Sequence, residues 1–295
     1  MALNEYSILL AAEYSFKGPV TSLCQYQQRY LLVGAGPQGV HILNLDGTRL
    51  VSIAHTSTRH FVSTLSASAS HIAVGDVRDS VILYTYREGR NSLDLLHSDV
   101  VSRVAQDVVM VDDETTAGIT LDGTFFLFKD TQDIEDQIGI GWNLSADCEI
   151  SLGEIPLRIR QGMLAYRPNI EPQSTPSEGR RMKERSVQNA LVLTTLVGSI
   201  IVLAWMDQAE FEVLDHLQYI MAMHSETRPI LGDSWKTFRS EGKEASRFRH
   251  VVDGDLLSQF LTLSEELQRE LLAGIPGATV QSITAALHAL NERVL

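Results

Sequence analysis

The stretch FVSTLSASASHIAVGDVRDSVILYTYREGRNSLDLLH, residues 61–97, decides the expected fold. It contains four short runs rich in β-branched, aromatic and aliphatic residues, separated by polar residues and glycine. Such runs are typical of strands joined by tight turns. Four strands within about 40–45 residues are typical of one blade of a β-propeller. The strands predicted here are Phe61–Leu65, His71–Val74, Ser80–Tyr86 and Leu93–His97.

The same arrangement recurs along the chain. Val20, Val62 and Val104 each open a set of strands, at a spacing of 42 residues. Asp46-Gly47 and Asp122-Gly123 are strong hairpin signals, because both residue types tolerate the left-handed backbone of tight turns. The other strands are expected at Tyr30–Val33, Val40–Leu45, Arg49–Ala54, Ala105–Val111, Thr115–Thr120, Phe125–Lys129, Cys148–Leu152, Leu157–Arg160, Met163–Tyr166, Leu191–Leu196 and Ile200–Trp205.

The sequence therefore predicts a mainly β fold, a partial β-propeller of about four WD40-like blades of four antiparallel strands each. A flat sandwich is the alternative, although it would need no repeat of 42 residues. Propellers typically have about 4–8 blades, and closure of the ring removes the sheet edges. We therefore expect the chain to be the C-terminal part of a larger protein, or to need a partner for its first strands.

Beyond Trp205 the spacing of apolar residues changes from strand to helix. Phe211, Leu214 and Leu217 follow helical spacing, and residues 279–294 carry a second apolar helical face. We therefore expect a propeller portion over residues 1–207 and a small helical C-terminal domain over residues 208–295. Residues 168–188 are rich in Pro, Ser and charge, which predicts a long mobile loop between two strands.

The composition excludes several classes of protein. Hydrophobic residues make up 44% of the chain and charged residues 21%, which excludes disordered and fibrous classes. The formal net charge of -13 argues against a surface that grips nucleic acid by bulk charge. Cys24 and Cys148 are too few for a disulfide framework or a multi-cysteine zinc module, and they favour a reducing compartment.

No targeting or membrane segment is expected. The first residues include no basic region of the kind that opens a secretory signal. The most apolar stretch, residues 190–206, is interrupted by Thr194, Thr195, Gly198 and Ser199. It therefore predicts two buried strands around a tight turn, rather than a membrane helix of about 20 apolar residues.

Four groups of residues are candidate sites of chemistry. Gly34–Gly39 matches G-x-G-x-x-G, but apolar, β-branched residues follow it instead of a helix, so we expect an ordinary turn. Ser199 lacks the strand-to-helix elbow of a serine nucleophile. Asp112-Asp113-Glu114 is expected to cap a turn rather than to bind a cation. The histidines are expected to be structural or exposed: His41, His55, His60, His71 and His97. The sequence therefore predicts no catalytic, cofactor or metal site.

Two basic clusters are candidates for contact with RNA, DNA or an acidic partner, although a solvated loop is the simpler interpretation. They are Arg180, Arg181, Lys183 and Arg185, and Arg239, Lys243, Arg247 and Arg249. The most distinctive stretch is Val252–Leu261. There, Gly254 is expected to permit a tight bend, Asp255 to cap a helix with Asp253 bracing the turn, and Phe260 to pack with the neighbouring leucines.

Several motifs run in order over about residues 13–275. They are Lys17–Cys24, Ile72–Val81 (with Gly75 and Asp76), Gly153–Leu157, Leu196–Ile200, Phe238–Ser240 and Val252–Leu256 (with Asp253, Gly254 and Asp255). Together they resemble the C-terminal region of the cleavage and polyadenylation specificity factor A-subunit family. This family includes the large subunit of UV-damaged-DNA-binding protein and the large propeller subunit of splicing factor 3b. Residues 72–87 and 229–240 look closest to a plant-type paralogue.

The resemblance implies a nuclear scaffold without a catalytic site, built from propellers and a C-terminal helical domain. The expected function is that of an interaction subunit in pre-mRNA splicing or in 3′-end cleavage and polyadenylation. The expected partners are other subunits of the complex, with RNA or DNA contact that is weak or passes through a partner. An adaptor that links substrate receptors to a cullin-type ubiquitin ligase in DNA repair is the alternative. A nucleotide-binding enzyme built on Gly34–Gly39 is the alternative from a different class.

Overall fold

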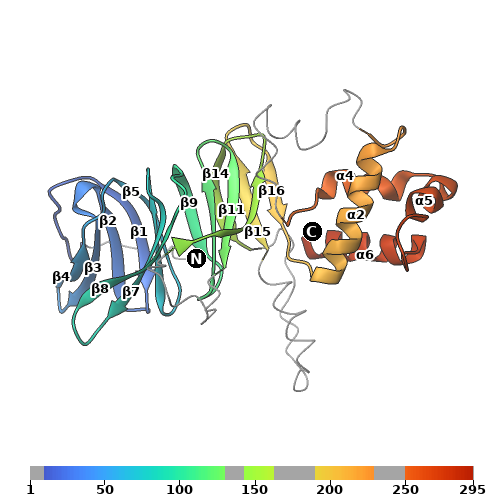
Figure 1. Cartoon of the computed structure of the whole chain (residues 1–295). Coiled ribbons are helices and arrows are strands. Elements are labelled where there is room, and N and C mark those ends of the chain that lie inside the picture. The colour runs from blue at the N-terminus through green and yellow to red at the C-terminus, as the bar shows by residue number, and fades with distance from the viewer. Residues whose placement is uncertain (1–9, 130–142, 163–189, 229–249, 295) are drawn as a thin grey trace, which may run out of the picture. The chain divides into compact units, whose positions relative to one another are not determined.

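The computed structural model of the chain describes residues 10–129, 143–162, 190–228 and 250–294. Within these residues the fold is mainly β (Figure 1). Four sheets form a partial β-propeller, and helices follow them in the chain, which confirms the predicted fold class. The predicted strand at 163–166 and the predicted mobile loop at 168–188 lie outside the described residues.

The first sheet is an antiparallel meander in the order β1-β2-β3-β4. Asp46 pairs with Arg49 across the predicted hairpin turn, where Gly47 has a φ of 60°. Glycine adopts this left-handed backbone without the steric cost that a Cβ would add. The strands are β1 (Val20–Tyr26), β2 (Tyr30–Ala35), β3 (Val40–Asp46) and β4 (Arg49–Thr56).

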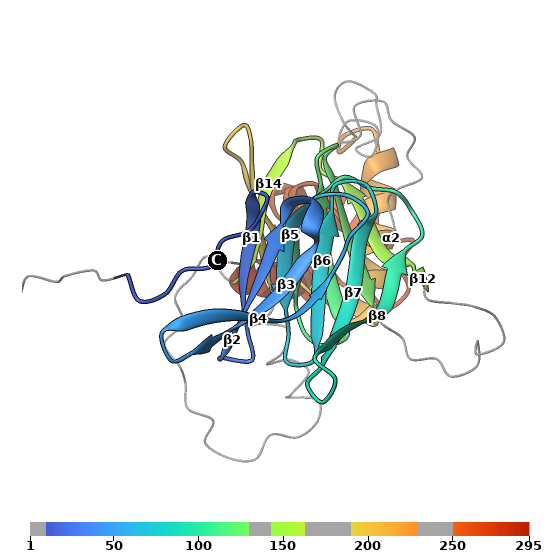
Figure 2. The same cartoon turned by 90° about the vertical axis from the view of Figure 1, so that its left-hand side faces the viewer.

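The second sheet has five strands in the order β12-β8-β7-β6-β5. Four of them form the antiparallel blade predicted from residues 61–97. The fifth, the short β12, pairs with β8 in parallel and was not predicted (Figure 2). The strands are β5 (Val62–Ala67), β6 (His71–Asp76), β7 (Ser80–Arg87), β8 (Ser92–Asp99) and β12 (Asn143–Leu144).

The third sheet has the order β13-β11-β10-β9, and the fourth has β14-β15-β16 within the described residues. In the fourth sheet, Leu191 pairs with Leu203 across the predicted hairpin. The strands are β9 (Ala105–Met110), β10 (Thr115–Thr120), β11 (Thr124–Lys129), β13 (Ala146–Ser151), β14 (Pro156–Gln161), β15 (Leu191–Thr195) and β16 (Ile200–Leu203).

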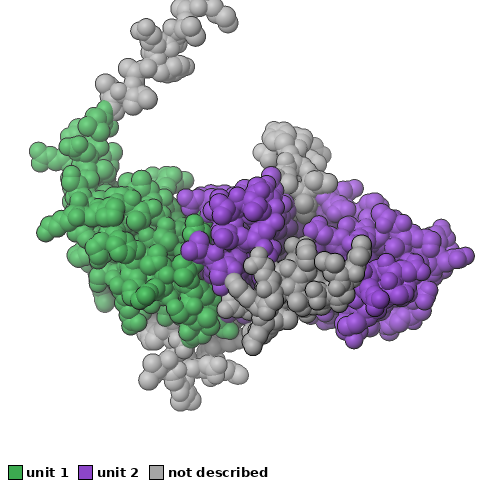
Figure 3. All heavy atoms as spheres, turned by 90° about the horizontal axis from the view of Figure 1, so that it is seen from above, with its two compact units in different colours: residues 1–116, 130–145 green, residues 117–129, 146–295 purple. Residues whose placement is uncertain are grey.

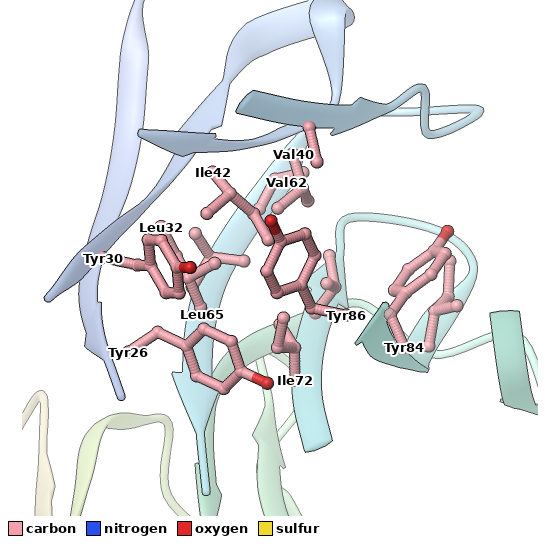
Figure 4. Packing of buried hydrophobic residues seen from close by; sticks show 13 residues of the cluster. Tyr26, Tyr30, Leu32, Val40, Ile42, Val62, Leu65, Ile72, Tyr84 and Tyr86 are labelled. Carbon is pink, nitrogen blue, oxygen red and sulfur yellow. The ribbon is translucent and has the colours of Figure 1, made fainter. Parts of the chain in front are cut away.

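The first two sheets share one apolar core (Figure 4). Side chains alternate across a strand, so every second residue of β2 and β3 faces the partner sheet. Leu32 and Ile42 from the first sheet are fully buried, as are Val62 and Ile72 from the second. Tyr86 of β7 packs edge-on against Tyr30 of β2, with ring centroids 5.5 Å apart. Burial of each large apolar side chain contributes about 1.5–3 kcal/mol.

The helices follow β16 and enclose a second apolar core, which includes Leu214, Leu217, Phe260, Leu271 and Ile283. The helix predicted from Phe211 onward begins one turn earlier, where the Asp207 side chain accepts a hydrogen bond from the Glu210 amide. The elements are α2 (Gln208–Met223), α4 (Gly254–Ser258), the 3-10 turn η4 (Gln259–Thr262), α5 (Glu265–Leu272) and α6 (Val280–Val294). None of the described helices is long and apolar enough to cross a membrane.

The chain divides into two compact units (Figure 3). Unit 1 comprises Met1–Thr116 and Asp130–Ser145, and unit 2 comprises Ala117–Lys129 and Ala146–Leu295. This division groups residues by packing and not by type of element. The predicted boundary between a propeller portion, 1–207, and a helical domain, 208–295, stays a prediction.

Candidate partner-binding surfaces

The stretch at Asp253 begins α4, and its cap differs from the prediction. The Asp253 side chain accepts hydrogen bonds from the amides of Asp255 and Leu256, at 3.0 and 3.4 Å. Asp253 is therefore the N-cap, and the prediction that Asp255 caps the helix is wrong. Asp253 takes this position because its own amide donates to Gln218 Oε1 of α2 at 2.5 Å, which fixes the chain just before the helix.

Gly254 and Phe260, which follow this cap, differ in how much the fold depends on them. Gly254 does not have a positive φ, and no atom lies within 4 Å of where its Cβ would be. The expectation was that Gly254 permits a tight bend, and the backbone at this position does not require glycine. Phe260 is completely buried in the core of unit 2, as predicted, and its carbonyl accepts a hydrogen bond from Gln268 Nε2 at 2.7 Å.

Gly75 and Asp76 shape the turn between β6 and β7. A Cβ on Gly75 would lie 2.5 Å from Thr64 Cγ2, so the strands approach too closely for any side chain. The Asp76 carboxylate, completely buried, accepts from the amides of Arg78 and Asp79 at 2.8 and 3.0 Å. Its Oδ2 atom has no hydrogen-bond partner within the described residues. Both residues serve the blade itself.

The glycine-rich motif is an inter-strand turn, as predicted. Residues Gly36–Gln38 form a single 3-10 turn between β2 and β3, with no α-helix after it to receive a phosphate. Gly39 has a φ of 84°, and a Cβ there would lie 2.1 Å from the Thr56 carbonyl oxygen. Glycine is therefore required at position 39 because the backbone at Thr56 lies too close for a side chain. The dinucleotide-binding hypothesis has no structural basis.

The remaining polar candidates are held in local contacts. The Asp112 carboxylate accepts from the amides of Glu114 and Thr115, which confirms its predicted role in capping a turn. The His41 and His55 rings stack at 5.5 Å, and burial together with the neighbouring His55 lowers the pKa of His41. Burial raises the pKa of the Cys148 thiol to about 12, so it stays protonated and is a poor nucleophile.

The two predicted basic clusters lie outside the described residues. The first cluster is Arg180, Arg181, Lys183 and Arg185, and the second is Arg239, Lys243, Arg247 and Arg249. Their contact with nucleic acid or with an acidic partner stays a prediction.

Exposed apolar side chains mark a surface in unit 2 that sequence reasoning missed. They lie at three turns, between β10 and β11, between β13 and β14, and between β15 and β16, or at the first residue of β16. Their exposed fractions run from 39% to 73%. We call this set the second loop patch: Leu121, Ile155, Leu196, Val197 and Ile200.

Hydrogen bonds hold these three turns together. The Leu196 amide donates to the Ile155 carbonyl at 2.8 Å, and the Leu152 amide donates to the Gly123 carbonyl at 2.8 Å. The Glu154 carboxylate accepts from Thr195 Oγ1 and Ser199 Oγ at 2.7 and 3.0 Å. The motifs Gly153–Leu157 and Leu196–Ile200 thus interlock around Glu154, and Ser199 is a structural donor.

A similar surface occurs in unit 1. Its side chains lie between β4 and β5 and between β8 and β9, and they are 45% to 59% exposed. The β6–β7 turn joins these segments, because the Val77 amide donates to the Phe61 carbonyl at 3.1 Å and Ser102 Oγ donates to the Arg78 carbonyl at 2.7 Å. We call this set the first loop patch: Phe61, Val100, Val101 and Val104.

The signal for both patches is visible in the sequence. Turns are normally built from polar residues and glycine. Val100-Val101 and Leu196-Val197 place adjacent apolar residues in segments that connect strands. Exposed apolar residues that lie together, unlike scattered ones, are typical of interaction sites.

Comparison with known proteins connects these features to a family. A family model described as the CPSF A subunit region matches residues 3–262, most of the chain. The chain belongs to this family. The match extends over the β-sheets and into the helical segment as far as η4, so it includes the Asp76 and Asp253 turns.

The curated relatives of this CPSF A family chain are named for DNA damage binding or for splicing. "DNA damage-binding protein 1" of Oryza sativa subsp. japonica is 24% identical over 298 residues, 99% of this chain and 26% of the relative. "Spliceosome-associated protein 130 A" of Arabidopsis thaliana is 27% identical, over 90% of this chain and 21% of the relative. "Probable splicing factor 3B subunit 3" of Dictyostelium discoideum is 22% identical, over 85% and 19%. The chain spans about a quarter or less of the length of these relatives.

Proposed function

We propose that the protein is a non-enzymatic scaffold subunit of a nuclear RNA-processing complex, in pre-mRNA splicing or in 3′-end cleavage and polyadenylation. The observation that carries the proposal is the pair of loop patches, apolar surfaces at connecting turns. Names from splicing among the relatives support the choice of complex. Catalysis is not part of the proposed role, since the glycine motif, Ser199 and Asp112 all serve local structure.

The loop patches are proposed to bind partner proteins. Burial of apolar surface stabilises an interface by about 25 cal/mol per Å², and the aliphatic side chains of both patches are already exposed at fixed turns. Little conformational entropy is lost on binding where hydrogen bonds hold the turns before the partner arrives. RNA or DNA contact is proposed to be weak or to pass through the partners.

A second candidate function is that of a ubiquitin-ligase adaptor in DNA repair. The relative named for DNA damage binding, similar over nearly the whole chain, favours this alternative. Both functions use the same kind of surface, so the identity of the bound proteins distinguishes them.

The test is affinity purification of the tagged chain from nuclear extract, with cytoplasmic extract as the control for location. Bound proteins are identified by quantitative mass spectrometry and bound RNA by sequencing. Leu196→Asp with Val197→Asp breaks the second loop patch, and Val100→Asp with Val101→Asp breaks the first. The matched control is Leu45→Asp with Val51→Asp, which changes two exposed apolar residues beside the β3–β4 turn.

We expect the wild-type chain to retain splicing or polyadenylation subunits, and at least one patch variant to lose them about tenfold or more. The control variant should retain them. Recovery of cullin and receptor subunits would instead support the adaptor function. Unchanged recovery by both patch variants would contradict the assignment of the loop patches.

A further inference from the structure

A third surface lies on α2 and is separate from the loop patches. The helix buries Leu214, Leu217 and Met221 in the core of unit 2. Its opposite face carries Glu212, Asp215, Tyr219 and Met223, all exposed and spaced three or four residues apart. Residues at this spacing form one continuous stripe along a helix. We call this stripe the acidic Tyr–Met face.

Two large side chains form its apolar part. Tyr219 and Met223 are one helical turn apart and are 63% and 67% exposed. The Tyr219 hydroxyl forms no hydrogen bond with the described residues. Tyrosine and methionine are enriched at the centres of protein interfaces, where an aromatic ring offers a large contact area at low entropic cost.

The carboxylates beside them bind no cation in the described part of the chain. Glu212 accepts from the neutral amide of Gln208 at 2.8 Å, and Asp215 accepts from that of Gln218 at 3.4 Å. The ion pairs of unit 2 involve other residues, such as Arg269 with Glu265 on α5. Both carboxylates on α2 are therefore available to a cationic group from outside.

We propose that the acidic Tyr–Met face binds a segment of a partner protein in which Lys or Arg residues flank apolar side chains. Charge complementarity selects this occupant, because the carboxylates attract Lys and Arg while the Tyr and Met side chains bury apolar ones. A phosphate backbone would be repelled. A second copy, packed through the same face, would bring like charges together.

The probe for the test is a labelled helical peptide of about 18 residues with Lys on one face and Leu on the other, which spans about five turns. The same peptide with Glu in place of Lys is its control. Binding to the full chain is measured by fluorescence anisotropy at roughly 50 mM and 300 mM salt, since screening weakens exposed charge pairs. We expect the Lys peptide to bind and the Glu peptide not to bind.

Variants decide where the peptide binds. Tyr219→Ser with Met223→Ser should weaken binding about tenfold or more, as loss of interface anchors does. Glu212→Gln with Asp215→Asn should weaken it and reduce its dependence on salt. The matched charge control is Glu265→Gln with Glu266→Gln, two exposed carboxylates on α5, and it should bind as the wild type does. Thermal melting verifies that each variant is folded.

Four results would overturn the proposal. The first is equal binding by the α2 variants and the α5 control. The second is a single-stranded RNA of similar length that competes for the same face. The third is a dimer of the chain that Tyr219→Ser with Met223→Ser dissolves. The fourth is a Lys peptide that binds only after residues 229–249 are deleted, which would assign the face to the chain's own segment. Variants of the loop patches should leave peptide binding unchanged. Failure of this proposal can therefore be distinguished from failure of the proposed function.

Discussion

Gly75-Asp76 and Asp253-Gly254 both pair a glycine with an aspartate that caps backbone amides, but the two glycines have different roles. At Gly75-Asp76 in unit 1, the carboxylate caps the turn between β6 and β7, and the glycine allows β6 to approach Thr64. At Asp253-Gly254 in unit 2, the carboxylate caps α4 in the same way, but the glycine lies in open space.

The comparison separates two roles that look alike in a sequence motif. A carboxylate that accepts from two amides satisfies donors that a turn or a helix start leaves unpaired. This role is common to Asp76 and Asp253. A glycine is required only where its missing Cβ or its left-handed backbone is used, and of these two positions only Gly75 meets that condition.

Gly75→Ala should destabilise unit 1 more than any other single change considered for these turns. The added Cβ would lie 2.5 Å from Thr64 Cγ2, and Thr64 is held by its hydrogen bond to Asp107 at 2.8 Å. Overpacking of this kind costs about 1–3 kcal/mol. The free energy of unfolding is measured by urea denaturation, and a loss below the error of the extrapolation would show that the strands can separate at no cost.

Asp253→Ala should destabilise unit 2 by about 1 kcal/mol, the typical cost of a lost N-cap. Asp255→Ala should cost less than Asp253→Ala, because the Asp255 carboxylate is not the cap and lies in the first turn of the helix. Chemical denaturation of the two variants side by side measures the difference. A greater loss of unfolding free energy for Asp255→Ala than for Asp253→Ala would show that Asp255 is the N-cap.

Gly254→Ala should have an effect of the opposite sign, a small increase in the free energy of unfolding. The backbone at Gly254 does not need glycine, and a Cβ there would contact no atom of the folded chain. Alanine lowers the conformational entropy of the unfolded chain, which stabilises the folded protein by about 0.4–1 kcal/mol. A thermal shift assay should show an unchanged or slightly higher Tm. A clear fall in Tm would mean that the open space beside Gly254 is used in the folded protein.

The sequence predicts the blades well because their signals are local. Runs of β-branched residues and turns such as Asp46-Gly47 define β2 to β11 within a few residues, and helical spacing defines α2 and α6. The interpretation of Gly34–Gly39 as a turn is also correct, since the residues after it favour a strand.

The parts that sequence reasoning missed depend on distant contacts. Which aspartate caps α4 is decided by Gln218, 35 residues earlier in the chain. The strand β12 exists only because it pairs with β8, and two residues carry no periodic pattern. The loop patches could have been predicted, because adjacent apolar residues in segments that connect strands are visible in the sequence.

The pairing of β12 with β8 has a consequence for synthesis on the ribosome. The β8 strand is complete at Asp99, but β12 does not begin until Asn143, and 43 residues separate them. At about 5–20 residues per second, the chain extends for roughly 2–9 s before β12 has been synthesised. During that interval the outer edge of β8 is an unpaired strand on a nascent chain, open to a chaperone or to a neighbouring polypeptide.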